Sequence, residues 1–520
     1  MSSKPYQDPA SDDEQDVVDM DEVAEEIAGD DEDGDVNMSD AEDDEGEELQ
    51  LINDSVAYFD AHKDSVFTIA QHPTNPNIIA TGGSEGDAED APGKGYVFVV
   101  PEIAQRDGPV LPPSFAADPQ AAAQEMASQR ENVQMQPVFA IEGHTDSINS
   151  LAFTYPSGDF LVSGGLDGRL RAYKVDAASG PSFTFVGESQ EVPEINWLAP
   201  CPSTDYPNSI ALGASDGSVW VYTIDPSDPA NPLQIVQTYF LHTSSCTAGA
   251  WTPDGGLLAT VDEESSLYVW DVWGIAAGKG LVENNGQTVA SLTPTDQRFF
   301  VEGGLYSVAV EPRGGYLAVG GAQGAIRIVS LPRMTGQTAG ASAQAGSKAG
   351  KGKAGKATAS RSAGGEAQAG QILAALQVQS DSIETLSFAP ASASVPLLAA
   401  GSVDGSITVY DPSRTFSVRR NIPGAHDEFS VVKVEWVRAP ASGQWLLTSC
   451  GMDGVVRRWN LQGANPSQHA PNAAVAGLEK EWRGHRGDGE GGGVLGFVQG
   501  LDGKRVVTAG DDGIVLLFEA

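Results

Sequence analysis

The segment Leu398–Tyr410 reads LAAGSVDGSITVY and contains the pattern that decides the fold. Apolar and small residues lead into an Asp404-Gly405 turn, and alternating apolar and polar residues then run to an aromatic residue. Alternation predicts a half-buried strand, and an Asp-Gly pair between two such runs predicts an antiparallel hairpin. Further copies of this unit are Leu161–Tyr173, Ile210–Tyr222, Leu258–Trp270, Leu317–Val329, Leu447–Trp459 and Val506–Phe518. A degenerate first copy at Ile79–Val99 completes a set of eight.

A histidine before an apolar strand is a second recurring signal. The histidines at this position are His62, His144, His242, His426 and His485. Together the two signals are typical of WD repeats, each of which forms one four-stranded blade of a β-propeller. The sequence therefore predicts an all-β fold, a single eight-bladed WD-repeat β-propeller with a disordered acidic N-terminal tail. Each histidine is expected to bond the acid of its turn, such as Asp167 or Asp453, which is a structural role rather than a catalytic one.

The two ends of the repeat array are predicted to join. The last copy ends at Phe518 without a fourth strand, and Ser55–Phe59 (SVAYF) precedes the first histidine. We expect this segment to pair with the last blade and close the ring. The predicted domains are the tail at 1–54 and the propeller at 55–520, with the closure strand at 55–59 and insertions at 101–131 and 333–370.

The distribution of charge indicates the kind of partner. The chain has 72 acidic and 30 basic residues, a formal net charge of −42, and residues 1–54 hold 23 of these acids but a single Lys. This balance opposes direct binding to DNA, RNA or an anionic membrane and favours a basic partner. So acidic a tail is expected to be disordered, although Val17, Met20, Ala24 and Ile27 recur at the spacing of a short amphipathic helix.

Several other classes of protein find little support in the sequence. No apolar stretch is typical of a signal peptide or a transmembrane span. Cys201, Cys246 and Cys450 form no disulfide framework, so we expect the cytoplasm, with a nuclear share left open. Residues 350–357 are spaced like a phosphate loop but lack the Ser or Thr after Lys356. The chain is therefore predicted not to be an enzyme and to hold no cofactor and no metal.

One face of the predicted ring should be strongly acidic, because the loops before the innermost strands and the acidic–Gly turns meet there. Glu384 follows Ile383, the first apolar residue of its strand, and should face the mouth of the central channel. Asp511 and Glu263 each precede the residue expected to be the structural turn acid, and should point outward. The basic residues expected at comparable positions are Lys63, Lys94 and Arg486.

Other residues are expected to divide between this acidic face and the rest of the ring. Most remaining cations, Lys433 among them, are predicted on outer strands and the opposite face. Apolar anchors among the acids are expected at Phe67, Trp197, Tyr306 and Phe429, with burial in the core as the alternative for each.

Two segments carry a closer resemblance than the repeats alone. One is Ile195–Leu198 (INWL), whose blade ends in the sequence SDGSVWVY at Tyr222. The other is Ile383–Phe388 (IETLSF), followed by PLLAAGSVDGSITVYD from Pro396 to Asp411. With the acidic tail, the eight copies and the closure strand, the chain resembles the WD-repeat family of the dedicated chaperone of large-subunit ribosomal protein L10 (uL16) and angio-associated migratory cell protein. The resemblance covers residues 55–520 apart from the two insertions.

The resemblance implies a function that agrees with the charge. A chaperone of this family would capture the basic, Arg-rich N-terminal segment of L10 on the acidic face, as the client is synthesised, and deliver it to pre-60S particles through transient ribosome association. Such a protein is expected to act as a monomer without binding DNA or membranes. The residues expected to bind the client are Glu384, Asp511, Glu263, Asp427, Glu428, Glu194 and Asp381.

Two other functions fit the same composition. A general chaperone of histones or other basic proteins would use the same acidic face but bind histone tails with comparable affinity. A WD-repeat scaffold or ubiquitin-ligase substrate receptor would instead form stable complexes that depend little on salt. Selectivity among basic peptides and the salt dependence of binding separate these alternatives.

Overall fold

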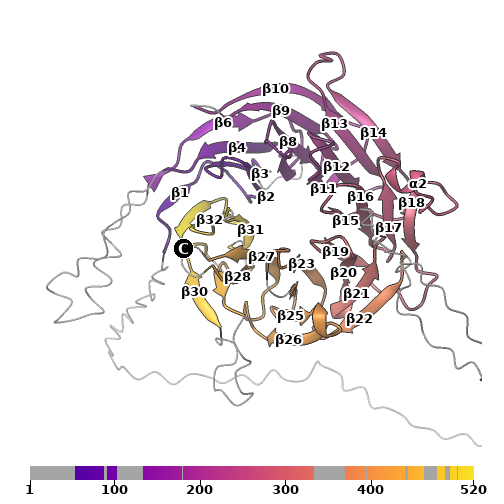
Figure 1. The fold of residues 1–520 in the computed structure, drawn as a ribbon. Coiled ribbons are helices and arrows are strands. Elements are labelled where there is room, and N and C mark those ends of the chain that lie inside the picture. The colour runs from indigo at the N-terminus through magenta and orange to yellow at the C-terminus, as the bar shows by residue number, and fades with distance from the viewer. Residues whose placement is uncertain are drawn as a thin grey trace, which may run out of the picture. The chain divides into compact units, whose positions relative to one another are not determined.

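The computed structural model describes residues 53–86, 91–101, 133–177, 180–332, 369–393, 396–439, 443–461, 477–486, 492–500 and 502–520. In these ranges, eight sheets follow one another around a central axis (Figure 1). The eight-bladed prediction is confirmed. The expected tail and the two expected insertions lie almost wholly outside the described residues.

The strands of the first four blades run from the innermost to the outermost in chain order. Blade 1 holds β2 (Thr68–Gln71), β3 (Ile78–Ser84), β4 (Gly93–Val99) and β6 (Pro137–Ile141). Blade 2 holds β7 (Ile148–Phe153), β8 (Phe160–Gly165), β9 (Leu170–Asp176) and β10 (Ser182–Ser189). Blade 3 holds β11 (Ile195–Pro200), β12 (Ser209–Ala214), β13 (Val219–Ile224) and β14 (Leu233–Tyr239). Blade 4 holds β15 (Cys246–Trp251), β16 (Leu257–Asp262), β17 (Leu267–Asp271) and β18 (Thr288–Leu292), with the short helix α2 (Ile275–Gly278) before β18.

The remaining blades repeat this order. Blade 5 holds β19 (Leu305–Val310), β20 (Tyr316–Gly321), β21 (Ala325–Ser330) and β22 (Ile372–Gln377). Blade 6 holds β23 (Ile383–Phe388), β24 (Leu398–Ser402), β25 (Ile407–Asp411) and β26 (Ser417–Ile422). Blade 7 holds β27 (Val431–Arg438), β28 (Trp445–Gly451), β29 (Val456–Trp459) and β30 (Leu478–Trp482). Blade 8 holds β31 (Val494–Val498), β32 (Arg505–Gly510) and β33 (Val515–Glu519).

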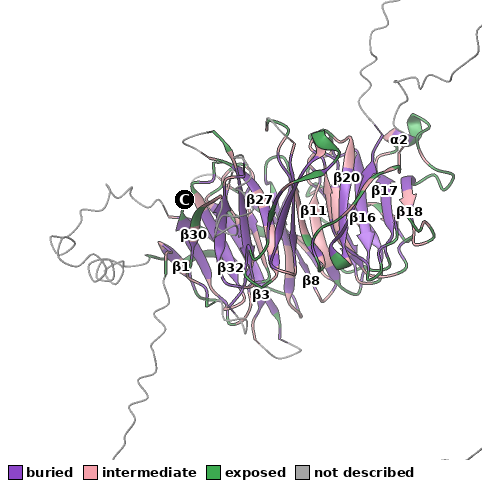
Figure 2. Cartoon of the chain, turned by 90° about the horizontal axis from the view of Figure 1, so that it is seen from below, coloured by how far each residue is buried: buried purple, intermediate pink, exposed green. Residues whose placement is uncertain are grey.

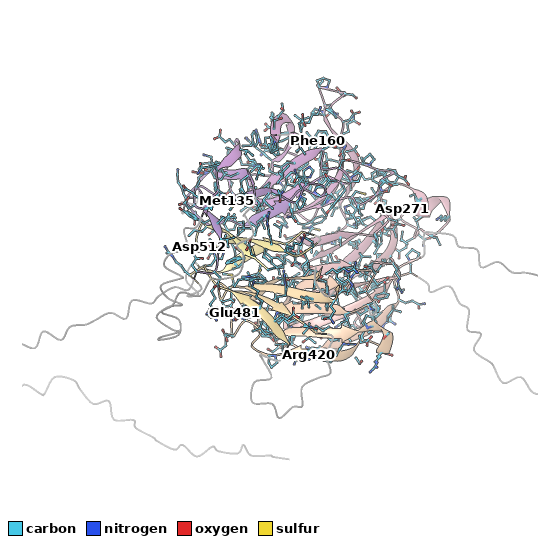
Figure 3. All side chains as sticks on the ribbon, turned by 60° about the vertical axis from the view of Figure 1, so that its left-hand side comes forward. Met135, Phe160, Asp271, Arg420, Glu481 and Asp512 are labelled. Carbon is cyan, nitrogen blue, oxygen red and sulfur yellow. The ribbon has the colours of Figure 1, made fainter. Side chains whose placement is uncertain are left out.

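Blade 8 is completed by two segments from the N-terminal part of the chain. β1 (Ala57–Phe59) pairs antiparallel with β33, and β5 (Val133–Gln134) pairs parallel with β1. The backbone N–H of Met135 donates to the Tyr58 carbonyl at 2.7 Å, and the Met135 side chain is buried (Figure 3). Because the chain then returns to β6 of blade 1, β5 joins the first and last blades a second time.

The hydrophobic core lies between neighbouring sheets. One cluster, for example, contains Phe160 of blade 2 together with Ile210 and Tyr222 of blade 3. Seen from the side, buried strands lie between two faces built largely of intermediate and exposed loops (Figure 2). The second strands of the blades, such as β8, β12 and β16, are buried along their whole length, because each sheet packs side chains of both its faces against neighbouring sheets. The helices among the described residues are all too short or too polar to span a lipid bilayer.

The acidic–Gly turns pack directly against the next blade. Gly168 has a φ of +72°, and a Cβ atom on it would lie 2.0 Å from the carbonyl oxygen of Val192. Only glycine meets both requirements without strain. In blade 4 the left-handed position is taken by Ser265, with a φ of 64°. The turns therefore hold neighbouring loops in close contact and place their acidic residues on one face of the ring.

Candidate functional site

A repeated irregularity in the innermost strands shapes the mouth of the channel. In blades 2–8 the pairing of the innermost strand shifts after its first residue, which leaves the second residue as a bulge. In three blades the bulged side chain bonds the first carbonyl of the next inner strand. Asn149 donates to Ile195 O at 2.6 Å, Asn196 to Cys246 O at 2.9 Å, and Thr247 to Leu305 O at 2.6 Å. Bulged side chains thus project along the mouth toward the following blade.

Glu384 is the bulged residue of blade 6 and lies beside three other polar groups. Its side chain is exposed, yet desolvation at the mouth and the charge of Asp381 raise its pKa above that of an ordinary glutamate. Tyr306, the bulged residue of blade 5, has its pKa raised by desolvation and by the charges of Glu263 and Glu384. Its hydroxyl donates to Gly303 O at 2.6 Å, which holds the ring in place. The structure therefore places Glu263 and Glu384 near Tyr306, with Asp381 near Glu384.

Two other predicted site residues occupy the turns. The backbone N–H of Glu263 donates to Ser245 O at 3.2 Å, and that of Asp511 donates to Gly493 O at 2.9 Å. Each turn is thereby tied to the residue before the inner strand of its own blade. The Asp511 carboxylate accepts a hydrogen bond from Ser65 Oγ at 2.5 Å, so it lies at the boundary between blades 8 and 1. It is separated along the rim from the cluster around Tyr306.

The remaining predicted acids lie in loops before inner strands. Glu194 precedes β11, and Asp427 and Glu428 lie before β27; all three are exposed. Asp381 precedes β23, and its carboxylate accepts the N–H of Ser382 at 2.7 Å. All seven predicted client-binding residues are thus on the same face as the turns, but they form a cluster around Tyr306 and separate acids along the rim rather than one compact pocket.

In the described ranges, the predicted basic residues of this face belong to the adjacent blades 8 and 1, and Arg486 is exposed in the loop before β31. Lys63 pairs with Glu85 at 2.9 Å, and Lys94 lies 3.7 Å from both Glu85 and Glu142. Arg169, which the sequence reasoning missed, lies in the turn of blade 2 and donates to Gly143 O. Arg169 was missed because it follows the Asp167-Gly168 pair by one residue and so falls just outside the turn positions at which charges were expected. In the described ranges, none of the seven predicted acids forms an ion pair, so negative charge is left uncompensated mainly on blades 4–7.

One expectation about a single residue is wrong. Lys433 is not on an outer strand but on the innermost strand β27, where Nζ donates to Phe497 O at 2.8 Å and pairs with Glu435 at 2.9 Å. For Trp197 the alternative of packing in the core holds, because its indole donates to Cys246 O and lies where a Cβ on Gly213 would stand. Of the other expected anchors, Phe67 and Phe429 are exposed and Tyr306 is partly exposed.

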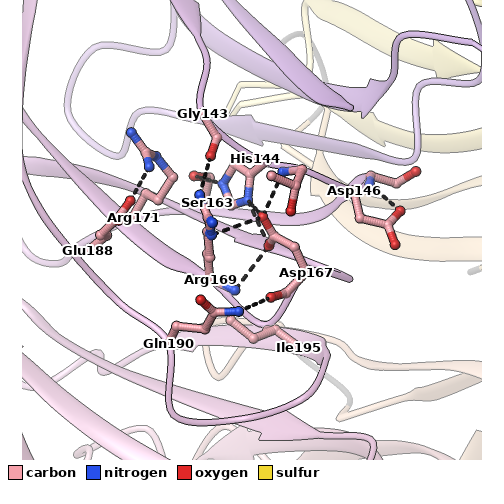
Figure 4. A network of polar contacts seen from close by, with 12 residues as sticks. Gly143, His144, Asp146, Ser163, Asp167, Arg169, Arg171, Glu188, Gln190 and Ile195 are labelled. Atoms are coloured by element: carbon pink, nitrogen blue, oxygen red, sulfur yellow. Dashed lines mark hydrogen bonds and ion pairs between the residues drawn. The ribbon is translucent and has the colours of Figure 1, made fainter. Parts of the chain in front are cut away.

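The repeat histidines hold the hairpins of their own blades together. His144 Nδ1 lies 3.1 Å from Asp167 Oδ1, and its Nε2 lies 2.8 Å from Ser163 Oγ (Figure 4). His426 and His485 make the equivalent contacts with Asp453 and Asp512. Such bonds satisfy buried polar groups inside each blade.

Blades 1 and 4 depart from the expected pattern. His62 bonds Thr81 at 2.9 Å, but its Nδ1 has no partner within the described residues, and burial lowers its pKa to about 4. His242 bonds Asp262 at 3.0 Å, whereas the repeat alignment points to Glu264, which is exposed. The turn acid of blade 4 is therefore the residue before Glu263 rather than the one after it. Over the ranges that the structure describes, no group of three His, Cys, Asp or Glu could hold a metal ion.

Comparison with known proteins adds to this geometry. Residues 135–174 and 233–271 match the family described as WD domain, G-beta repeat. The ribosome assembly protein SQT1 of Saccharomyces cerevisiae is 29% identical over 250 residues, which is 47% of each chain, so the match spans about half of that curated relative.

Solved structures extend the similarity over nearly the whole ring. Sqt1 of Chaetomium thermophilum is 56% identical, with 90% of this chain and 98% of that chain covered and a TM-score of 0.73. Another structure, of the same protein bound to the N-terminus of ribosomal protein L10, is equally similar and is covered to 100%. The Sqt1 structure from Saccharomyces cerevisiae is 22% identical with a TM-score of 0.63, and supports the fold alone.

Proposed function

This chain belongs to the Sqt1 family, and we propose that it is a ribosome assembly factor that captures the basic N-terminal segment of ribosomal protein L10 and delivers it to pre-60S particles. The observation that carries the proposal is the structure of the 56%-identical relative bound to the N-terminus of L10. The arrangement of charge in this chain supports it, since the acids around Tyr306 form no ion pair within the described residues.

The proposed site is the acidic mouth of the ring. Arginine guanidinium groups form short, charge-assisted and often bidentate hydrogen bonds with carboxylates. Glu384 and Glu263 on two sides of Tyr306 would offer two such acceptors, with Asp381 beside them. Asp511, Asp427, Glu428 and Glu194 would draw further basic residues of the client to the same face.

The proposed mechanism is competition between two anions. Carboxylates at the mouth bind the cationic side chains of the client that later contact ribosomal RNA. This binding keeps the free client from associating with other nucleic acids. Release follows when the RNA of the pre-60S particle offers more contacts than the ring does. No bond is made or broken, so the proposal needs no catalytic residue. It places the protein in the cytoplasm, where L10 is synthesised, as a monomer.

The direct test is binding of an N-terminal L10 peptide to the full chain by fluorescence anisotropy at two salt concentrations. We expect tight binding that weakens with salt, because exposed charges attract less strongly as ionic strength rises. A histone-tail peptide of matched charge should bind more weakly. Equal affinity for the two peptides would contradict a dedicated chaperone, and no binding to either would overturn the proposal.

A pair of double variants assigns the face. Glu384→Lys with Asp511→Lys should abolish peptide binding while the ring stays folded, as judged by circular dichroism. Asp205→Lys with Asp502→Lys makes the same change of net charge, but these exposed acids follow β11 and β31 at the opposite ends of the inner strands. The control should bind the peptide nearly as well as the parent. Intact binding by the first pair at low salt would contradict the assignment of the site.

A further inference from the structure

The bulged residues divide the channel mouth into sectors of different chemistry. Seven are defined by shifts in strand pairing, and Phe67 holds the corresponding place in blade 1, between Val66 and the first paired residue Thr68. In chain order the eight bulge positions are Phe67, Asn149, Asn196, Thr247, Tyr306, Glu384, Val432 and Leu495. Apolar, neutral polar and acidic residues are therefore grouped around the ring rather than mixed.

The neutral polar sector is already satisfied from within. Asn149, Asn196 and Thr247 each donate a hydrogen bond to the backbone of the next blade. These groups are engaged in holding neighbouring blades together, which leaves the acidic and the apolar sectors to contact a ligand. The acidic sector consists of Tyr306 and Glu384, with Glu263 and Asp381 beside them.

The apolar sector consists of Val432, Leu495 and Phe67 in the consecutive blades 7, 8 and 1. Val432 packs against the cluster that contains Val494, as expected for a bulged side chain directed to the next blade. Phe67 retains 41% of its surface, an unusually large fraction for a phenylalanine at the centre of a ring. Exposed apolar surface beside a charged site is typical of a place where a partner is bound.

The two sectors adjoin where blade 6 meets blade 7, and each extends around its own part of the mouth. Blade 1 and blade 5 are four positions apart in a ring of eight, so Phe67 lies across the mouth from Tyr306. A peptide that crosses the mouth with an arginine at the acidic sector also reaches the apolar sector. An extended chain advances about 3.3 Å per residue, so the width of the mouth fixes how many residues separate the two contacts.

We propose that the apolar sector of Val432, Leu495 and Phe67 takes up one large apolar side chain of the same basic client segment whose arginine lies between Glu263 and Glu384. This inference rests on the proposed function and deepens it, because it adds a second requirement to positive charge. A basic peptide without an apolar residue at the right distance from its arginine is bound weakly. Selection among basic proteins then depends on this spacing.

Phe67→Ser in the full chain tests the inference against the N-terminal L10 peptide. We expect about tenfold weaker binding, because the remaining apolar surface of one aromatic side chain is no longer covered. The loss should be the same at low and high salt, whereas the loss caused by Glu384→Gln should shrink as salt rises. Phe240→Ser is the matched control, since Phe240 is even more exposed, at 66%, but packs against Trp220 outside the mouth.

The peptide supplies the second arm of the test. Replacing its apolar residues by serine one at a time should identify one residue whose loss weakens binding to the parent but adds nothing to Phe67→Ser. Unchanged binding by Phe67→Ser would overturn the inference while leaving the proposed function standing. A Phe67 effect that disappears when an arginine of the peptide is replaced would assign Phe67 to a guanidinium and also overturn it. If the parent binds no L10 peptide, the proposed function fails, and this inference with it.

Discussion

Asp262→Ala and Glu264→Ala form a matched pair of changes within one turn of blade 4. Asp262 is fully buried and lies within hydrogen-bond distance of His242 Nδ1 at 3.0 Å. It also accepts the N–H of Ser266 at 2.7 Å and the hydroxyl of Ser266 at 2.5 Å. Glu264 is exposed and occupies the position at which most other repeats carry their turn acid. The repeat alignment and the structure therefore predict opposite orders of stability for the two variants.

The expected loss of stability follows from the hydrogen-bond donors that each substitution leaves without an acceptor. Asp262→Ala strands the buried N–H of Ser266 and leaves His242 Nδ1 with only the Ser266 hydroxyl, at 2.9 Å. A buried donor without an acceptor costs about 1–3 kcal/mol, so we expect a loss of about 2–5 kcal/mol in the free energy of unfolding. Glu264 is exposed and makes no hydrogen bond or ion pair with the other described residues, so Glu264→Ala should stay within about 0.5 kcal/mol of the parent.

Urea unfolding followed by tryptophan fluorescence measures the difference. Trp270 is a suitable reporter because its indole donates to Thr260 Oγ1, which in turn contacts His242. Asp262→Asn, which keeps one acceptor oxygen, should lie between Asp262→Ala and the parent. Destabilisation by Glu264→Ala equal to or greater than that by Asp262→Ala would refute the assignment of Asp262 as the turn acid.

Three further outcomes follow from closure, burial and desolvation. Phe59→Ala should destabilise the ring by about 3–5 kcal/mol in urea, because Phe59 is buried in the closure strand, whereas Val133→Ala should cost well under 1 kcal/mol since Val133 is exposed. Burial lowers the pKa of His62 to about 4, so the stability that the neutral histidine contributes is fully present above pH 6.5 and is lost progressively as pH falls toward 4. Between pH 7 and pH 5 the free energy of unfolding of the parent should fall by about 2 kcal/mol more than that of His62→Gln. Equal losses in the two proteins would contradict a neutral buried histidine. The raised pKa of Glu384 should make L10 peptide binding weaken as pH falls, beginning above the range in which an ordinary glutamate titrates, and Glu384→Gln should show a flatter profile.

The fold could be predicted because its determinants are local. Each hairpin is encoded within one repeat, where an apolar run, an acidic–Gly turn and an alternating strand follow one another. The turn glycine at Gly168 adds a requirement of close approach that the structure explains, since any Cβ there would meet Val192 O. The face on which Glu384 lies could likewise be read from its place after the first apolar residue of an inner strand.

The ion pairs could not be predicted in the same way. Lys63 and Lys94 pair with Glu85, whereas the acids around Tyr306 form no ion pair within the described residues, and this distinction depends on which side chains meet in space. The place of Lys433 on an inner strand was missed although its segment alternates, because alternation does not say which strand of a blade a segment becomes. Both depend on how strands and side chains are placed in space, which the local pattern does not contain.

The sequence by itself determined the number of blades, the position of the turns and the acidic character of the chain, because these depend on residue order and composition. Only the tertiary structure decided that Asp262 replaces Glu264 beside His242, that β5 joins blade 8, and that Phe67 lies across the mouth from Tyr306. The physical reason is the geometry of the ring. Its closure brings side chains from distant repeats to one channel, and their pairing there depends on distances that the order of residues does not contain.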